Sequence, residues 1–211
     1  VAKYLLNFER GGAMAPMLQV WADAVAEQAA GQPGPDGTSL ADDPAAAAQF
    51  REQLREATHD YGFFYLVGHG IDPALTTEII SVSRSFFALP EADKLEIENV
   101  TSPHYRGYTR VGGERTQGKV DWREQIDIGP ERPAVPTGPG VSDYWVLQGP
   151  NLWPSALPRV REVVELWNQT LAGVATRLLA EWAESLGQPR DIFDETFGIK
   201  ACANPVTRTA R

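Results

Sequence analysis

The three histidines of this sequence, His59, His69 and His104, are the side chains best suited to bind a metal ion. A mononuclear iron site takes two histidines and one carboxylate on one face. Two of these ligands can be built compactly as His-x-Asp or His-x-Glu on a strand, because residues i and i+2 project from the same side. None of the three has a carboxylate two residues later: Asp60 follows His59 directly, and Arg106 follows His104 at this spacing. We therefore expect a helix end, a turn and a loop at these histidines, and no metal ligand among them.

A glycine-rich stretch over residues 101–123 carries a surplus of cations in an otherwise acidic protein. Arginine presents a fork of donors that matches a carboxylate, and tyrosine adds an apolar face with a hydroxyl. The stretch could therefore hold an acidic small molecule. The other interpretation is a solvated loop whose cations pair with nearby acids. The residues concerned are the cations Arg106, Arg110, Arg115, Lys119 and Arg123, the acids Glu114, Asp121 and Glu124, and the tyrosines Tyr105 and Tyr108.

Two other patterns resemble catalytic or nucleotide-binding motifs and fail on context. The run from Gly113 to Lys119 matches the first part of a phosphate-binding loop, but Val120 stands where a hydroxyl should bind Mg²⁺. A strand before the loop and a helix after it are also required, and neither is evident. The single cysteine, Cys202, has no histidine after it, and no Gly-x-Ser-x-Gly elbow occurs. We expect neither nucleotide binding nor a nucleophilic triad.

Composition sets broader limits. The 211 residues carry a formal charge of −9, and 43% are hydrophobic, which suits a packed core of one domain or somewhat more. The excess of acids argues against a nucleic-acid partner, and one cysteine excludes an intrachain disulfide framework. No secretory signal and no apolar run of membrane-spanning length is present, so we expect no membrane partner and a cytoplasmic location.

The first half of the chain predicts helices around one strand. Asp43-Pro44 and Asp72-Pro73 are each typical of an N-cap followed by proline at the first helical position. Helices are therefore expected from residue 44 to about 61 and from 73 to about 86, and a short one after Pro90. Between the first two, the run from Gly62 to Gly68 is aromatic and β-branched, which predicts a buried strand.

The second half predicts one strand and one long helix. Periodicity is lost over 101–123, residues 125–129 alternate polar and apolar as in a short strand, and a proline-rich loop covers 130–140. Apolar residues then recur at helical spacing from Val160 to Leu186, and Gly187 follows as a stop. Such a helix is roughly 40 Å long, and its apolar stripe must lie along something large.

Several of these stretches, in this order, resemble the isopenicillin N synthase-like branch of the 2-oxoglutarate- and Fe(II)-dependent oxygenases. The resemblance covers about residues 43–197 and corresponds to the family's non-haem dioxygenase N-terminal domain. The matching pieces are Tyr61–Ile71 (YGFFYLVGHGI), Phe86–Lys94 (FFALPEADK), Tyr105–Tyr108 (YRGY), Asp121–Gly129 (DWREQIDIG) and Trp153-Pro154.

The resemblance implies a helix-rich α+β region that would pack on a double-stranded β-helix, or jelly roll, largely missing from this chain. It implies a non-haem dioxygenase N-terminal-like domain over 43–198, after a poorly matched Ala/Gly/Pro-rich leader (1–42) and before a divergent tail (199–211). In the family, the His-x-Asp and distal His ligands of iron and the arginine that binds 2-oxoglutarate belong to the jelly roll. The resemblance therefore assigns no Fe(II) or 2-oxoglutarate ligand here, and His69 matches a structural histidine. It makes Arg106 and Tyr108 the candidate substrate contacts.

The expected function is the N-terminal portion of an oxidoreductase that hydroxylates, desaturates or cyclises a small organic substrate. We expect this chain to be a truncated or frame-disrupted member, or a fragment of a longer product, and to be inactive alone. The alternative is a non-catalytic binding or interaction module derived from the same domain. The sequence names neither the substrate nor the oligomeric state.

Overall fold

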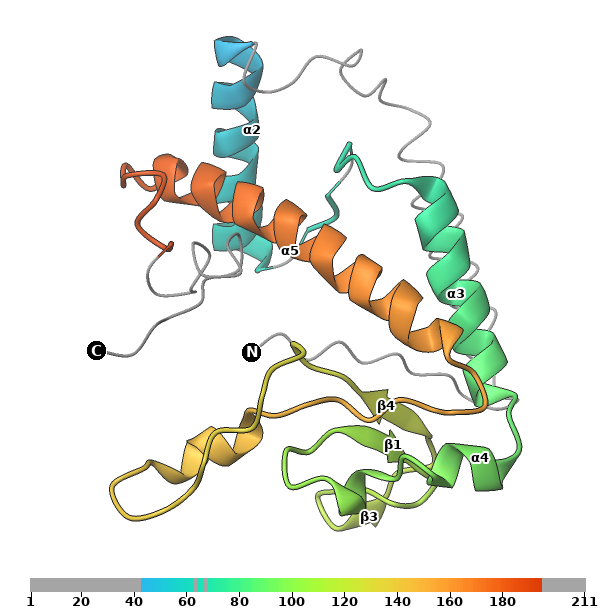
Figure 1. Cartoon of the computed structure of the whole chain (residues 1–211). Helices are drawn as coiled ribbons and strands as arrows, with labels where there is room; N and C mark the ends of the chain where they lie inside the picture. The colour runs from blue at the N-terminus through green and yellow to red at the C-terminus, as the bar shows by residue number, and fades with distance from the viewer. Residues whose placement is uncertain (1–42, 63, 67, 195–211) are drawn as a thin grey trace. The chain divides into compact units, whose positions relative to one another are not determined.

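The computed structural model describes residues 43–194 except 63 and 67 and divides the chain into two compact units. Of the described residues, the first unit holds 71–168 and the second holds 43–70 together with 169–194. Figure 1 labels most of their helices and strands. The expected leader and divergent tail, including Cys202, lie outside the described residues.

In the second unit, helix α2 (Pro44–Glu56) begins where the Asp-Pro pair predicts it. The Asp43 carboxylate accepts the amides of Ala45 (2.9 Å) and Ala46 (3.1 Å), which supplies partners to two N–H groups that the helix itself leaves free. The helix continues as one π-helical turn, η1 (Ala57–Tyr61). It ends at Gly62, whose φ of 76° lies in the left-handed region that glycine adopts without a steric cost.

The strand expected over residues 62–68 is not formed by the residues of this run that the structure describes. The described residues 64–66 belong to no strand, and the expectation of burial is also wrong, since Phe64 is 38% and Tyr65 56% exposed. Strand-forming composition needs a neighbouring strand to accept and donate its main-chain hydrogen bonds. Among the described residues, no strand pairs with this segment.

The long helix is confirmed as α5 (Arg159–Ser185), within one residue of each expected end. Its C-terminus is a Schellman motif: the amide of Gly187 donates to the carbonyl of Glu184 (2.9 Å), and that of Gln188 to the carbonyl of Ala183 (2.9 Å). Gly187 has φ 70°, which explains why glycine occupies this position. The N-terminal residues 159–168 of α5 belong to the first unit and the remainder to the second.

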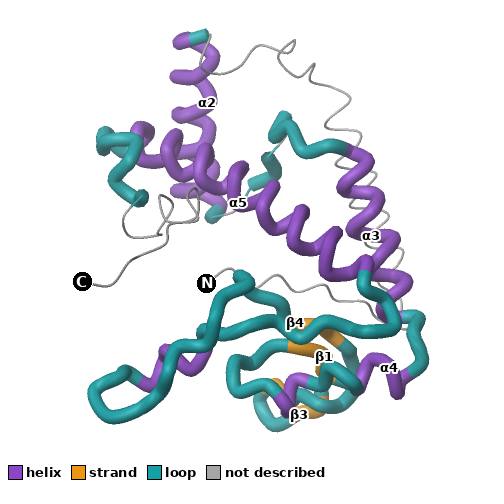
Figure 2. Tube along the Cα trace, viewed as in Figure 1, coloured by secondary structure: helices purple, strands orange, loops and turns teal. Residues whose placement is uncertain are grey.

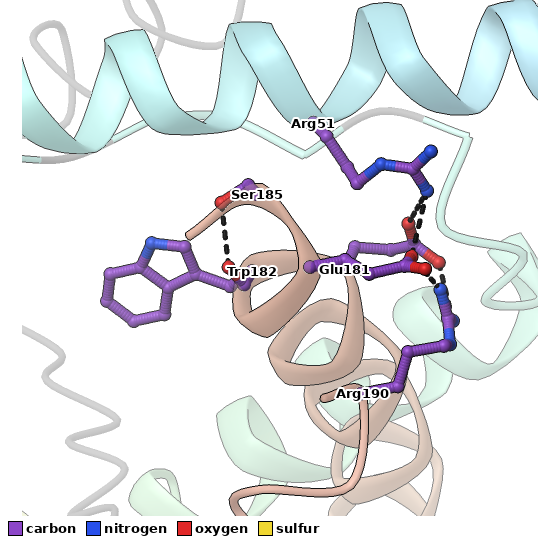
Figure 3. A network of polar contacts seen from close by, with 6 residues as sticks. Arg51, Glu181, Trp182, Ser185 and Arg190 are labelled. Carbon is purple, nitrogen blue, oxygen red and sulfur yellow. Dashed lines mark hydrogen bonds and ion pairs between the residues drawn. The ribbon is translucent and has the colours of Figure 1, made fainter. Parts of the chain in front are cut away.

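Within the second unit, charged side chains join α2 to the end of α5. Arg51 on α2 donates to Glu181 and Glu184 at 3.0 Å each, and Arg190, beyond the end of α5, bonds the same two carboxylates. Figure 3 shows the two arginines converging on the glutamates while Trp182 points away from them. Burial would raise the pKa of Glu181, but hydrogen bonds from Arg190 and Arg51 outweigh burial and hold this pKa below its ordinary value.

The first unit opens with two helices that also begin as expected. Helix α3 (Pro73–Phe87) is capped by Asp72, whose carboxylate accepts the amide of Ala74 at 2.8 Å. Helix α4 (Glu91–Leu95) follows Pro90, with acids in its first turn where the helix dipole favours them. A 3-10 turn, η2 (Asn99–Thr101), leads from α4 into the glycine-rich stretch.

The glycine-rich stretch is more ordered than its lack of periodicity suggests. It contains strand β1 (Gly107–Thr109) and the hairpin of β2 (Arg115–Thr116) with β3 (Lys119–Val120). Strand β4 (Gln125–Asp127) pairs antiparallel with β1, with Tyr108 opposite Ile126. These strands are two or three residues long, too short for a sequence period to show. Figure 2 shows how much of this unit is loop.

The core of the first unit gathers apolar side chains from α3, from the β1–β4 pair and from the start of α5. The short strand expected from the alternation over residues 125–129 is confirmed as β4, and its polar residues are buried as well. Gln125 is 2% exposed, and its amide donates to Glu114 and Asp127 at 3.0 Å each. The core residues are Ile79, Val82, Phe86, Phe87, Ile97, Tyr108, Ile126, Val160, Val163 and Val164.

The described chain is thus helix-rich with a few short strands, which agrees with the α+β class. None of its described helices has both the length and the apolar character needed to cross a membrane.

Candidate functional site

Residues 102–109 place the two predicted substrate contacts, Arg106 and Tyr108, on one turn and the strand that follows it. The hydroxyl of Ser102 accepts the amides of His104 (3.2 Å) and Arg106 (3.4 Å), which closes the turn. Gly107 has φ 114°, and a Cβ there would lie 2.2 Å from the carbonyl oxygen of Ile97. Only glycine fits this approach, so the Arg-Gly-Tyr order follows from the packing of β1.

Arg106 is partly buried, and its described partners are main-chain carbonyls. Nη1 donates to the carbonyls of His104 (3.0 Å) and Tyr105 (3.5 Å), and Nη2 donates to that of Leu147 (3.2 Å). The guanidinium also lies against Gly129, where a Cβ would come within 2.6 Å of Nη2, Cζ and Nε. In the described part of the chain no carboxylate forms an ion pair with Arg106, so its charge is available to an anion.

Tyr108 lies in a different environment, inside the core. Its ring is 2% exposed, and its hydroxyl donates to Oε2 of Glu124 at 2.7 Å. The same oxygen accepts the ammonium of Lys94 at 2.6 Å, and this ammonium also donates to the carbonyl of Phe87 at 3.2 Å. Lys94 further lies 5.3 Å from the centroid of the Tyr108 ring. The arrangement fastens α4, β1 and the residue before β4 to one another.

The structure therefore does not bring Arg106 and Tyr108 to one binding surface. Their described polar partners are entirely different, because Arg106 lies in the turn before β1 while Tyr108 lies within β1 and points into the core. A substrate could reach the guanidinium of Arg106 at the surface of the first unit. It could touch Tyr108 only if the core around Lys94 and Glu124 opened.

A second polar arrangement closes the base of the proline-rich loop beside Arg106. The side chain of Asn151 bonds both main-chain groups of Gly129, accepting its amide and donating to its carbonyl at 2.9 Å each. Glu131 accepts from Nδ2 of Asn151 (2.7 Å) and from Nε1 of Trp153 (3.3 Å). These contacts join residues about twenty positions apart, so the loop leaves and re-enters the fold at one place.

The solvated-loop interpretation holds for some of the remaining cations. Arg123 pairs with Glu114 (3.1 Å) and Asp121 (3.6 Å), as the solvated-loop interpretation expects. Glu124 instead pairs with Lys94, from outside the stretch. Among the described residues, no carboxylate pairs with the exposed Arg115 or Lys119, which leaves their charges open to an acidic ligand.

The phosphate-loop pattern over residues 113–119 is a hairpin turn. Gln117 and Gly118, at φ 51° and 79°, form the tight connection between β2 and β3. Two successive residues with positive φ are typical of a type I′ turn, in which no helix N-terminus faces a phosphate. The helix that a phosphate-binding loop requires after it is replaced here by strand β3.

The histidines lie where the sequence predicts a helix end, a turn and a loop. His59 is in the π-helical turn with Nδ1 2.6 Å from Asp60, the carbonyl of His69 accepts from Arg177 (3.3 Å), and Nδ1 of His104 bonds the carbonyl of Val146 (2.7 Å). Within residues 43–194, less the two undescribed positions, no group of three or more His, Cys, Asp or Glu side chains could hold a metal ion.

Sequence reasoning missed the buried pair of Lys94 and Glu124 and the loop closure by Asn151 and Glu131. A pattern search cannot find them, because each joins positions twenty to thirty residues apart. The one available signal is Lys94, a charged residue in a short helix between two apolar segments.

Comparison with protein families gives a match over residues 33–156 to the family described as non-haem dioxygenase in morphine synthesis, N-terminal. A 2-oxoglutarate-dependent dioxygenase from the fungus Dothideomycetidae sp. is 37% identical over 159 residues, which cover 75% of this chain and 42% of that protein. A homoarginine-6-hydroxylase from Oryza sativa is 34% identical over 150 residues, covering 70% and 44%. The chain thus spans less than half the length of these relatives.

Solved structures also match this chain over about half of their own length. A putative 2-oxoglutarate-Fe(II) oxygenase family protein from Caulobacter crescentus superposes with a TM-score of 0.58 at 27% identity, covering 70% of this chain and 47% of that one. A full-length protein from Neurospora crassa, solved in complex with α-ketoglutarate and thymine, superposes with a TM-score of 0.57 at 22% identity, covering 74% and 48%. At that identity the second match shows the fold alone.

Proposed function

Because the chain belongs to the non-haem dioxygenase N-terminal family, we propose that it is the N-terminal portion of a 2-oxoglutarate- and Fe(II)-dependent oxidoreductase. The complete enzyme hydroxylates, desaturates or cyclises a small organic substrate. Bound iron and 2-oxoglutarate supply the oxidising chemistry there. The described residues do not fit a metal site, so no step of the reaction is assigned to them, and the metal and cosubstrate bind elsewhere in the complete enzyme.

The observation that carries this proposal is the exposed, strand-prone segment that follows α2. Tyr61 is 70%, Phe64 38% and Tyr65 56% exposed, although the composition of the run is typical of a buried strand. The segment is held at two points, by the left-handed turn at Gly62 and by the bond from Arg177 to the carbonyl of His69. An apolar segment held in this way suits burial against another domain, and we propose that the catalytic jelly roll buries it.

Within this proposal the first unit contributes to substrate binding. Arg106 is the direct contact, because its guanidinium is partly exposed and has no carboxylate partner in the described chain. Tyr108 acts indirectly, by holding β1 and therefore the turn that bears Arg106. The relatives named homoarginine-6-hydroxylases support a small-molecule substrate without identifying the one for this chain.

The test compares the 211-residue chain alone with the same chain produced together with the C-terminal part of the 37%-identical fungal dioxygenase. Succinate formation from 2-oxoglutarate in the presence of Fe(II) is the measurement. We expect none from the chain alone and measurable turnover from the mixture. Stoichiometric tight Fe(II) binding, or succinate formation by the chain alone, would defeat the proposal, and so would a mixture that forms no complex on gel filtration.

The DNA that follows codon 211 provides a second test. The proposal of a truncated, frame-disrupted or fragmentary enzyme expects a His-x-Asp-containing jelly-roll sequence in one of the three reading frames. Its absence from all three frames would contradict that proposal.

A non-catalytic binding module remains the second candidate, favoured by the closed core of the first unit. Phe86, Tyr108 and Val163 are each at most 2% exposed, and the Lys94–Glu124 pair lies within the same core. A cooperative unfolding transition of a monomer that binds no hydrophobic dye would support this candidate. Aggregation or strong dye binding would support the enzyme fragment.

A further inference from the structure

Residues 130–150, called the arm below, form a long excursion whose two ends are fastened at one place. Gly129 and Asn151 are joined by two hydrogen bonds at its base. The carboxylate of Glu131 accepts a third from the side chain of Asn151, which follows the arm. Figure 1 shows the arm, which contains η3 (Asp143–Leu147), extending away from the β1–β4 pair of the first unit.

Two side chains of the turn before β1 hold the returning part of the arm. Nδ1 of His104 bonds the carbonyl of Val146 at 2.7 Å, and Nη2 of Arg106 donates to the carbonyl of Leu147 at 3.2 Å. Both side chains pack on glycines at the ends of the arm, Arg106 on Gly129 and His104 on Gly149, where a Cβ would overlap them. Between them, Tyr105 takes a φ of 54°, which is unusual for a residue other than glycine.

The bonding of Arg106 in this position is incomplete. A guanidinium has five N–H donors, whereas its acceptors among the described residues are three neutral carbonyls, and none of these residues accepts from the buried Nε. An unmet buried donor is costly, and a hydrogen bond to a charged acceptor is roughly twice as strong as one to a neutral carbonyl. A carboxylate that reached Nη2 would displace the neutral carbonyl of Leu147 and give the guanidinium a charged acceptor, while Nε stays covered beside Gly129.

We propose that Arg106 is a carboxylate-responsive latch: it holds the arm when no ligand is bound and releases it when a ligand carboxylate takes the guanidinium. The proposal rests on the function proposed above, in which Arg106 contacts the substrate. His104 takes no part in the exchange, and its bond to Val146 keeps the released arm close to the site.

The arm also indicates what kind of molecule carries the carboxylate. Tyr144 is 61%, Trp145 38% and Leu147 46% exposed, and the rings of Tyr144 and Trp145 lie 5.0 Å apart. Leu147 is the residue whose carbonyl Arg106 holds, so these apolar side chains belong to the segment that Arg106 fastens. The ligand is therefore a carboxylic acid with an apolar body rather than a small inorganic anion.

The test is amide hydrogen exchange of residues 141–148 in the 211-residue protein, with phenylacetate as the probe. These residues include the hydrogen-bonded amides of Val141, Trp145 and Gln148. We expect phenylacetate to raise their exchange rates roughly tenfold, as the loss of about one charge-assisted hydrogen bond would. Chloride at equal ionic strength should leave the rates unchanged.

Variants identify the latch. Arg106→Gln should show fast exchange of the arm without ligand and no response to phenylacetate. Arg106→Lys, which keeps the charge and loses the fork, should behave similarly. Arg132→Gln removes an exposed arginine of the arm that has no described contact, and should respond as the unaltered protein does.

The proposal fails if phenylacetate leaves the exchange of the unaltered protein unchanged, or if it accelerates exchange equally in Arg106→Gln. Should Arg106→Gln not fold, as exchange of the α3 amides would show, the unaltered protein and Arg106→Lys decide. The readout needs no turnover, so a failure here is distinguishable from a failure of the oxygenase assignment, which the succinate assay tests.

Discussion

At the scale of single residues, the difference between Arg106 and Tyr108 is one of burial and charge. Both come from the same four-residue motif, yet one guanidinium meets only neutral carbonyls while the neighbouring hydroxyl completes a buried ion pair. A charge without a counterion is free to recognise a ligand. A hydroxyl bonded to Glu124 inside the core serves the stability of the fold.

This division predicts the effect of Tyr108→Phe on stability. Removal of the hydroxyl leaves the buried Glu124 carboxylate short of one donor, which should lower the free energy of unfolding by about 1–3 kcal/mol. Urea denaturation followed by circular dichroism measures the loss. Tyr144→Phe, at a ring that is 61% exposed, is the matched control and should change stability by less than about 0.5 kcal/mol. Equal effects of the two changes would contradict the structural role of Tyr108.

At the scale of elements, the second unit depends on the ion pairs between α2 and α5 shown in Figure 3. The side chain of Glu181 is only 13% exposed, and it accepts hydrogen bonds from both Arg51 and Arg190. A carboxylate in an ordinary exposed ion pair has one such partner. Surface pairs contribute little, but a shielded carboxylate between two arginines contributes more.

The lowered pKa of Glu181 sets the direction of a pH dependence. A carboxyl whose pKa is lower in the folded than in the unfolded chain adds stability above the unfolded pKa of about 4.3 and loses it as the pH falls through the folded value. Glu181→Gln should therefore reduce the melting temperature at pH 7 and make little difference near pH 3. Glu56→Gln, at an exposed glutamate with no described contact, should show no such convergence. A constant deficit of Glu181→Gln across this range would disprove the explanation.

Replacement of glycine by alanine should have opposite effects on stability at two positions, one inside α5 and one at its C-terminal cap. Both have open space where a Cβ would lie, so only the backbone decides. Gly187→Ala forces alanine into φ 70° and should destabilise by about 1 kcal/mol, whereas Gly173→Ala, inside the helix, should stabilise by about 0.5–1 kcal/mol. Thermal unfolding of the two variants checks the signs. A stabilising Gly187→Ala would rule out the assigned cap.

At the scale of the whole molecule, exposed apolar side chains distinguish an enzyme portion from a self-sufficient module. The stripe along α5 is buried at Val160 and Val163 in the first unit, but Trp182 is 36% and Leu186 53% exposed in the second. Phe64 and Tyr65 are exposed in the second unit as well, so several large apolar side chains of its described residues face solvent.

These exposed side chains predict hydrophobic-dye binding by the 211-residue protein. The change Phe64→Ser with Tyr65→Thr should lower the fluorescence of bound 1-anilinonaphthalene-8-sulfonate by at least about half, because it removes two large exposed rings. Val100→Ser, at a side chain that is 77% exposed in the first unit, is the control and should have a small effect. An unchanged dye signal in the double variant would show that the segment after α2 is not the exposed surface.

The sequence by itself determined the helices, their caps and the family. Asp-Pro starts, apolar residues at helical spacing and a terminal glycine depend on neighbours within one or two turns, so α2, α3 and α5 were predicted nearly to the residue. The order of the motifs identified the N-terminal dioxygenase domain. Tertiary structure decided the features that depend on distant partners. Residues 64–66 form no strand because no described strand pairs with them. The burial of Gln125 and the separate environments of Arg106 and Tyr108 likewise follow from tertiary contacts. These outcomes depend on groups that lie ten or more residues apart in the sequence, a relation that a local pattern does not contain.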